Sequence, residues 1–230
     1  MRTQIKTRVG FHAAMLWLAA GVMSAACSAS WAQDVPGYPP LTPYTQQNGP
    51  YDPRELGMLP RYCYSTQVIR NFVPGANAQE EVDKWFAVLG GTFIHLHHYC
   101  WGMMKSNRAI LLAQDHQVQQ FYLLDALDEY DYVIKRATPD FVLLPEILTK
   151  KAENLFRVGR APVAIYELEH AIDIKPDYWP PYARLADHYK EAGQIQKARK
   201  TLEAGLKAAP DTPALTRRLA ELQVPEPRRK

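Results

Sequence analysis

Hydrophobic residues recur at helical spacing through most of the second half of the chain and much of its middle. Over 79–89 the apolar side chains fall on one face of a helix, and a pair of glycines then interrupts the pattern. Similar stripes predict helices over 92–104 and 118–136, the last of which ends before Pro139. We therefore expect 93–139 to form a helical hairpin with an insertion in its loop.

The pattern becomes regular between 145 and 212, where one arrangement of small, large, Gly and Pro positions is written twice. Equivalent residues are separated by about 34 positions, the period of a helix-turn-helix solenoid. The equivalent pairs are Gly159 and Gly193, Ala164 and Ala198, and Pro176 and Pro210. Small residues allow two helices to cross closely, glycine allows the chain to reverse, and proline ends the second helix.

These residues resemble two tetratricopeptide repeats, and 213–222 resembles the capping helix that follows such repeats. One departure is Lys151, which stands where the family pattern prefers leucine. The resemblance implies an all-α, right-handed stack of helical hairpins over 145–222. The segment 61–144 is then an irregular N-terminal cap followed by the divergent hairpin.

The resemblance also implies a function, because tetratricopeptide arrays bind protein segments in a concave groove lined by their first helices. Carried over position by position, the groove residues are Thr149, Lys150, Glu153, Phe156 and Arg157, then Ala183, Arg184, Asp187, Lys190 and Glu191. The four basic members favour a carboxylate or an acidic segment of a partner. The alternative is a solvated helix face on which these charges pair with the acidic members.

The N-terminal segment 1–32 has the pattern of a bacterial export signal, with a basic start, a short apolar run and small residues. Two cleavage sites are open: a general site before Gln33, and a lipoprotein-like site before Cys27, which would then carry lipid. Many prolines in 33–60 predict an extended tether. We expect a periplasmic protein, either soluble or anchored to the outer membrane through this lipid, with no membrane helix in the mature chain.

Export also bears on the two cysteines that remain after cleavage, Cys63 and Cys100. In an oxidising compartment two such thiols favour a disulfide, and the alternative is a pair of separately buried thiols. The formal net charge of +3 is small, and part of it lies in the leader and in the basic tail 223–230, which we expect to be disordered. Because no basic stripe is evident on a folded face, we expect no binding of nucleic acid.

A dense set of metal-capable side chains lies between His95 and Met104 and includes His97, His98 and Cys100. In an exported protein this set would suit copper or zinc, but on a helix it splits between two faces. The alternative is a buried aromatic helix whose histidines bond to polar neighbours. We therefore expect no cofactor, and a periplasmic metal-binding protein remains the second hypothesis.

Enzyme signatures are absent from the sequence: it has no phosphate loop, nucleophile elbow, zinc-protease helix or Cys-x-x-Cys pair. An acidic group is more typical of a solvated helix face than of a carboxylate site; it comprises Asp125, Asp128, Glu129 and Asp131. The leading hypothesis is a cell-envelope scaffold or assembly factor that recruits a protein or peptide partner through its groove.

Overall fold

The computed structural model describes residues 53–111 and 115–222, which all belong to one compact unit. These residues form helices and connecting turns, with no strand among them. The expected leader with Cys27, the tether up to residue 52 and the basic tail lie outside the described residues. Within the described part, no helix combines the length and the apolar character needed to cross a membrane.

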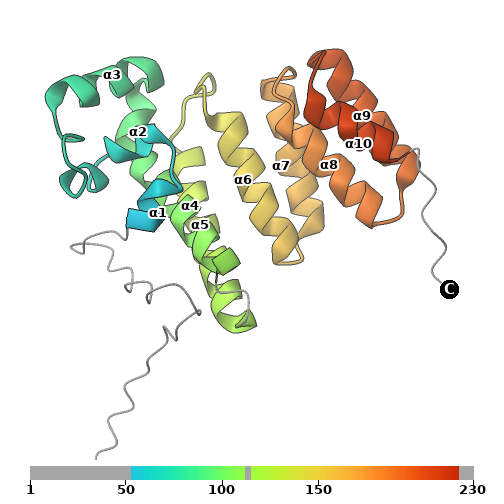
Figure 1. Ribbon diagram of the computed structural model, residues 1–230, viewed down its shortest axis with the longest axis horizontal. Coiled ribbons are helices and arrows are strands. Elements are labelled where there is room, and N and C mark those ends of the chain that lie inside the picture. Colours follow the sequence, from blue (N-terminus) through green and yellow to red (C-terminus); the bar gives the residue numbers. More distant parts are fainter. Residues whose placement is uncertain (1–52, 112–114, 223–230) are drawn as a thin grey trace, which may run out of the picture. The chain divides into compact units, whose positions relative to one another are not determined.

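The helices follow one another in chain order as successive pairs (Figure 1). Their bounds are α1 Pro53–Gly57, α2 Arg61–Tyr64, η1 Ile69–Asn71, α3 Gln79–Leu89, η2 Gly91–His95, α4 Leu96–Leu111, α5 His116–Ile134, α6 Leu144–Arg157, α7 Ala161–Ile174, α8 Pro180–Glu191, α9 Ile195–Ala208 and α10 Pro213–Glu221. Helix α4 packs on α5, α6 on α7, and α8 on α9, while α10 closes against α8 and α9. The predicted all-α stack of helical hairpins is confirmed.

Small residues at the helix crossings explain why each pair packs closely. Ala152, Ala164 and Ala198 are fully buried, and leucines such as Leu168 and Leu202 fill the space beside them. Each buried leucine contributes about 2 kcal/mol of hydrophobic stabilisation. The stack is thus held by the repeated small-and-large pattern that is visible in the sequence.

The turn inside each repeat requires its glycine. Gly159 has φ +76° and Gly193 has φ +71°, in the left-handed region where a side chain is strained. In the first repeat, the amide of Arg160 donates to the carbonyl of Leu155 at 2.8 Å, and the amide of Gly159 donates to Phe156 at 3.0 Å. These bonds satisfy the last carbonyls of α6, so the helix ends and the chain reverses.

A third glycine, Gly102, determines how closely α4 and α5 approach. A Cβ atom at this position would overlap the ring of Tyr130, which is fully buried. The Tyr130 hydroxyl lies 2.8 Å from Oγ of Ser106, and Ser106 in turn accepts a bond from Asn154 of α6. A series of hydrogen bonds therefore joins the α4–α5 hairpin to α6, the first helix of the first repeat.

Helix α4 differs from the helix predicted over 92–104. Residues up to His95 form the 3₁₀ helix η2, and α4 then continues beyond the predicted end, through Ser106, Asn107 and Arg108, to Leu111. The hydroxyl of Ser106 donates to the Gly102 carbonyl, and the buried Arg108 pairs with Glu55. Ser106 and Arg108 thus have hydrogen-bond partners in the folded protein, so these polar side chains do not end the helix.

The partner of Arg108 comes from a segment expected to belong to the tether. Residues Pro53–Gly57 form α1, and Glu55 is fully buried with Arg108 Nη2 at 2.8 Å from its Oε2. The folded body therefore begins before residue 60, because this buried ion pair fixes a proline-containing segment to α4. The cap that follows is irregular, as predicted, with only the short helices α2 and η1.

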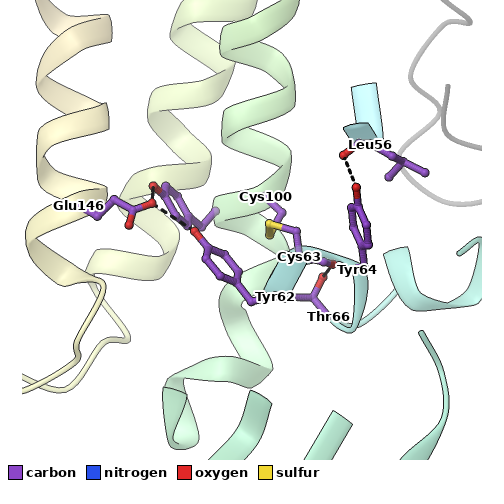
Figure 2. Close-up of a disulfide and its surroundings, with 8 residues drawn as sticks. Leu56, Tyr62, Cys63, Tyr64, Thr66, Cys100 and Glu146 are labelled. Atoms are coloured by element: carbon purple, nitrogen blue, oxygen red, sulfur yellow. Dashed lines mark hydrogen bonds between the residues drawn. A yellow bond between two sulfur atoms is a disulfide. The ribbon is translucent and has the colours of Figure 1, made fainter. Parts of the chain in front are cut away.

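A disulfide between Cys63 and Cys100 joins the cap to α4 (Figure 2), which confirms the pairing and excludes two separate thiols. The Cα atoms are 5.7 Å apart, and both residues are completely buried. Around the bridge, the Thr66 hydroxyl donates to the carbonyl of Cys63 at 2.7 Å, and the Tyr64 hydroxyl donates to Leu56 at 2.9 Å. The covalent bond is thus embedded in a locally satisfied segment.

Lys151, the departure from the repeat pattern, lies between two carboxylates. Its Nζ is 2.7 Å from Asp131 of α5 and 2.6 Å from Glu167 of α7. Burial alone would lower the pKa of Lys151, but the hydrogen bonds to these two acids outweigh it and raise the pKa. The lysine therefore stays charged and links three consecutive helices.

Candidate partner-binding groove

A groove of about 630 Å³ lies between α6 and α8, the first helices of the two repeats. The residues that line it are Glu153, Phe156, Arg157, Ala161, Arg184, Asp187, His188, Lys190 and Glu191. Most of them recur three or four positions apart on their helix, so they project from one face. The tetratricopeptide-like arrangement of hairpins thus brings most of the sequence-predicted groove residues together.

Two aromatic rings provide the apolar part of the groove. Phe156 of α6 and His188 of α8 stack with ring centroids 4.5 Å apart and an interplanar angle of 22°. The sequence analysis missed His188, although it lies four residues after Arg184 on the same helix and helical spacing could have identified it. This stacked pair offers a flat surface to an apolar or aromatic side chain.

Glu153 organises the basic residues on the α6 side. Its side chain is only 13% exposed and holds Arg184 Nε at 2.6 Å and Lys150 Nζ at 3.2 Å, while both cations remain more than 40% exposed. Arg184 Nη1 also lies 4.0 Å from Asp187, so two carboxylates are shared among three cations, Lys150, Arg184 and Arg218. Lys150 lies beside the groove and is not among its lining residues. The remaining donors of Arg184 and Lys150 are available to an anionic group.

Asp187 is paired on the other side of the groove by a residue of the capping helix. Arg218 of α10 binds it through two contacts, Nε to Oδ1 at 2.9 Å and Nη2 to Oδ2 at 3.1 Å. Lys190 lies 3.5 Å from Glu221, also on α10. The capping helix thus neutralises part of the groove, a role that the sequence did not indicate because these contacts cross about 31 residues.

Arg157 is the exposed cation of the groove that forms no ion pair with any described carboxylate. Its Nη1 donates weakly, at 3.5 Å, to the backbone carbonyl of Glu153. Two residues assigned to the groove by resemblance, Thr149 and Ala183, are instead buried within the packed helices. Thr149 donates to the carbonyl of Pro145 at 2.7 Å, so its hydroxyl is already satisfied.

The side chains of the histidine-rich segment contact aromatic rings, a disulfide partner and a carboxylate. Within 53–111 and 115–222, no group of three or more His, Cys, Asp or Glu side chains is placed to hold a metal ion. Cys100 is bound in the disulfide, and the rings of His97 and His98 pack together with centroids 4.4 Å apart beside Trp101. The two rings thus pack against each other and against an indole, and Nδ1 of His97 is buried without a hydrogen-bond partner among the described residues.

His97 and His98 have their contacts with neighbouring rings and with a carboxylate. Burial, followed by the charge of His98, lowers the pKa of His97 to about 4. Nδ1 of His98 lies 2.5 Å from Glu129, whose other oxygen is 2.6 Å from Lys105. Burial alone would raise the pKa of Glu129, but the bonds from His98 and Lys105 outweigh it and lower the pKa.

This network corrects the interpretation of the acidic residues of α5 as a solvated face. Asp128 is exposed, and the side chains of Asp125 and Asp131 are 33% and 37% exposed. The expectation of a solvated face fails most clearly at Glu129. Glu129 is buried against Lys105, which also binds Asp125 at 2.8 Å, and Asp131 pairs with Lys151. The acids neutralise lysines inside the stack, which spacing along one helix could not reveal.

Comparison with known proteins bears on the repeats. Residues 155–222 match the family model described as tetratricopeptide repeat. No curated protein matches the chain. Among solved structures, the chain is similar to the first tetratricopeptide repeat domain of Spaghetti (RPAP3), bound to the HSP90 peptide SRMEEVD, with 19% sequence identity and a TM-score of 0.37. That match covers 54% of this chain and 91% of that chain.

Proposed function

We propose, on the premise that 155–222 are tetratricopeptide repeats, that this protein is an exported scaffold of the bacterial cell envelope that binds a segment of a partner protein. The observation that carries the proposal is the groove between α6 and α8, with an aromatic floor and incompletely neutralised cations. Arg157, Arg184 and Lys150 favour a segment with an acidic side chain. The partner's backbone would cross the stacked rings of Phe156 and His188.

The envelope location is supported by two independent features. The pattern over 1–32 is typical of segments that direct a chain out of the cytoplasm. The buried disulfide suits an oxidising compartment, where such bonds form and persist. The intact mass of the mature protein distinguishes the two anchoring routes: a diacylated N-terminal Cys27 means a membrane anchor, and a chain that begins at Gln33 means a soluble protein.

Binding is tested with random peptides displayed on phage and selected on the oxidised full chain, followed by affinity measurements with synthetic peptides. Replacement of Arg184 by Glu inverts a charge in the groove and should weaken binding of the selected acidic peptides about tenfold. Lys200→Glu is the matched control, since Lys200 is exposed on α9 and does not line the groove.

Equal affinity of the Arg184→Glu variant and the wild-type chain for these peptides would refute binding in the groove. Thermal unfolding of both variants separates loss of binding from loss of structure, because Arg184 also holds Glu153.

A further inference from the structure

Glu146, in the first turn of α6, has an unusual set of partners (Figure 2). The hydroxyl of Tyr99 from α4 donates to its Oε1 at 2.7 Å, and the hydroxyl of Tyr62 from α2 donates to the same oxygen at 3.2 Å. Burial and the Glu146 carboxylate both raise the pKa of Tyr62, so this hydroxyl stays protonated and can donate. Two neutral donors from the cap and the first hairpin therefore fix the position of this carboxylate.

The other oxygen of Glu146, Oε2, has no hydrogen-bond partner in the described part of the chain, and the residue is only half-buried. This distinguishes Glu146 from every other buried or half-buried carboxylate among those residues, each of which pairs with a lysine or arginine. The paired carboxylates are Glu55, Glu81, Asp125, Glu129, Asp131, Glu153, Glu167 and Asp187. Glu146 is thus held in place, accessible on one side and without a cation.

Glu146 lies on the face of α6 that leads into the groove. Glu153 is seven residues further along, so the two side chains project from the same face, about 10 Å apart along the helix axis. Tyr178, just before α8, is close to both: burial, followed by Glu146 and then Glu153, raises its pKa. A segment that leaves the groove along α6 toward the start of that helix would reach Glu146.

We propose that Glu146 binds a lysine or arginine side chain of the segment that occupies the groove. The inference rests on the proposed function and specifies the bound segment, which would place an acidic residue against Arg184 and a basic residue against Glu146. The free oxygen accepts a charge-assisted hydrogen bond from the ammonium or guanidinium group. An extended chain covers the distance from Glu153 to Glu146 in about three residues.

The experiment uses peptides selected on the oxidised full chain and a matched counterpart of each, in which the lysine or arginine is replaced by methionine. The chain is compared with its Glu146→Gln variant, whose amide oxygen still accepts from Tyr62 and Tyr99. Glu146→Gln should weaken binding of the basic peptides about fivefold and leave the methionine peptides unchanged. A merely structural role for Glu146 would affect both peptides equally.

The outcomes separate the two proposals. Binding that is weakened by Arg184→Glu but not by Glu146→Gln refutes the role of Glu146 and leaves the groove intact. Selection that yields no peptide sensitive to Arg184→Glu refutes both. If Glu146→Gln lowers the unfolding midpoint, the test is made with the wild-type chain instead. Replacing the basic residue of the peptide by methionine should then weaken binding about fivefold. An unchanged affinity overturns the proposal.

Discussion

Removal of the disulfide should cost this protein much of its stability. The change is the double substitution Cys63→Ala and Cys100→Ala, made in a Cys27→Ala background so that no third thiol can mispair. The two cysteines are 37 residues apart in the sequence, and closing a loop of this length reduces the entropy of the unfolded chain by the equivalent of about 4 kcal/mol. Both side chains are fully buried, so the lost sulfur atoms add about 1 kcal/mol of packing.

Equilibrium urea unfolding, followed by circular dichroism, measures this difference between the double variant and its Cys27→Ala parent. Hydrogen exchange locates it: amides of α2, η1 and α4 should lose protection, because the bridge joins these elements, whereas amides of α8 and α9 should lose less. A decrease in the free energy of unfolding below about 1 kcal/mol would refute the argument that the bridge fixes the cap.

Two further changes test the interior of the stack. Gly102→Ala should destabilise the protein by about 1–2 kcal/mol in urea unfolding, because the new Cβ overlaps the Tyr130 ring, and Gly57→Ala, with open space around it, is the control; equal stability of both variants would show that α4 and α5 can separate freely. The pKa of His97 is about 4 in the folded chain against an ordinary 6.5, so the unfolded chain takes up the proton first and stability should fall as the pH drops from about 6.5 to 4. His97→Gln should flatten this part of the stability profile by about 1–2 kcal/mol, less than the full shift implies because the ring is only half-buried and solvent screens its charge. An unchanged slope would contradict the assignment.

Local chemistry explains which features were predictable. The hairpin turns followed from Gly159 and Gly193, because the requirement for a left-handed residue is a property of one position. The start of the fold at α1 was not predictable, since Glu55 becomes ordered only through Arg108, far along the chain. Proline content over 33–60 described the unfolded preference of that segment and carried no information about its partner.

The groove, too, was predictable from the sequence only in part. Resemblance identified its position, and helical spacing placed Glu153, Phe156 and Arg184 on facing helices. The sequence did not decide whether the basic groove residues bind a partner or pair with acidic residues of the chain, because the pairing depends on distances between helices. Several of them do pair, with Glu153 as a shared acceptor, and the contacts from Arg218 and Glu221 of α10 could only be seen in the folded chain.

Lys151, which links α5, α6 and α7, also affects the order in which the hairpins can stack. Chains built from similar repeats risk exchanging hairpins between copies or stacking them in the wrong order. At the position about 34 residues after Lys151, the second repeat has Leu185, which packs in an apolar cluster with Leu168. A hairpin inserted out of turn would keep Glu167 of its own helix α7, but it would bury Lys151 without Asp131 of the preceding helix α5. Because the ion pair between Lys151 and Asp131 forms only when α6 follows α5, one substitution in the repeat pattern favours that order of hairpins.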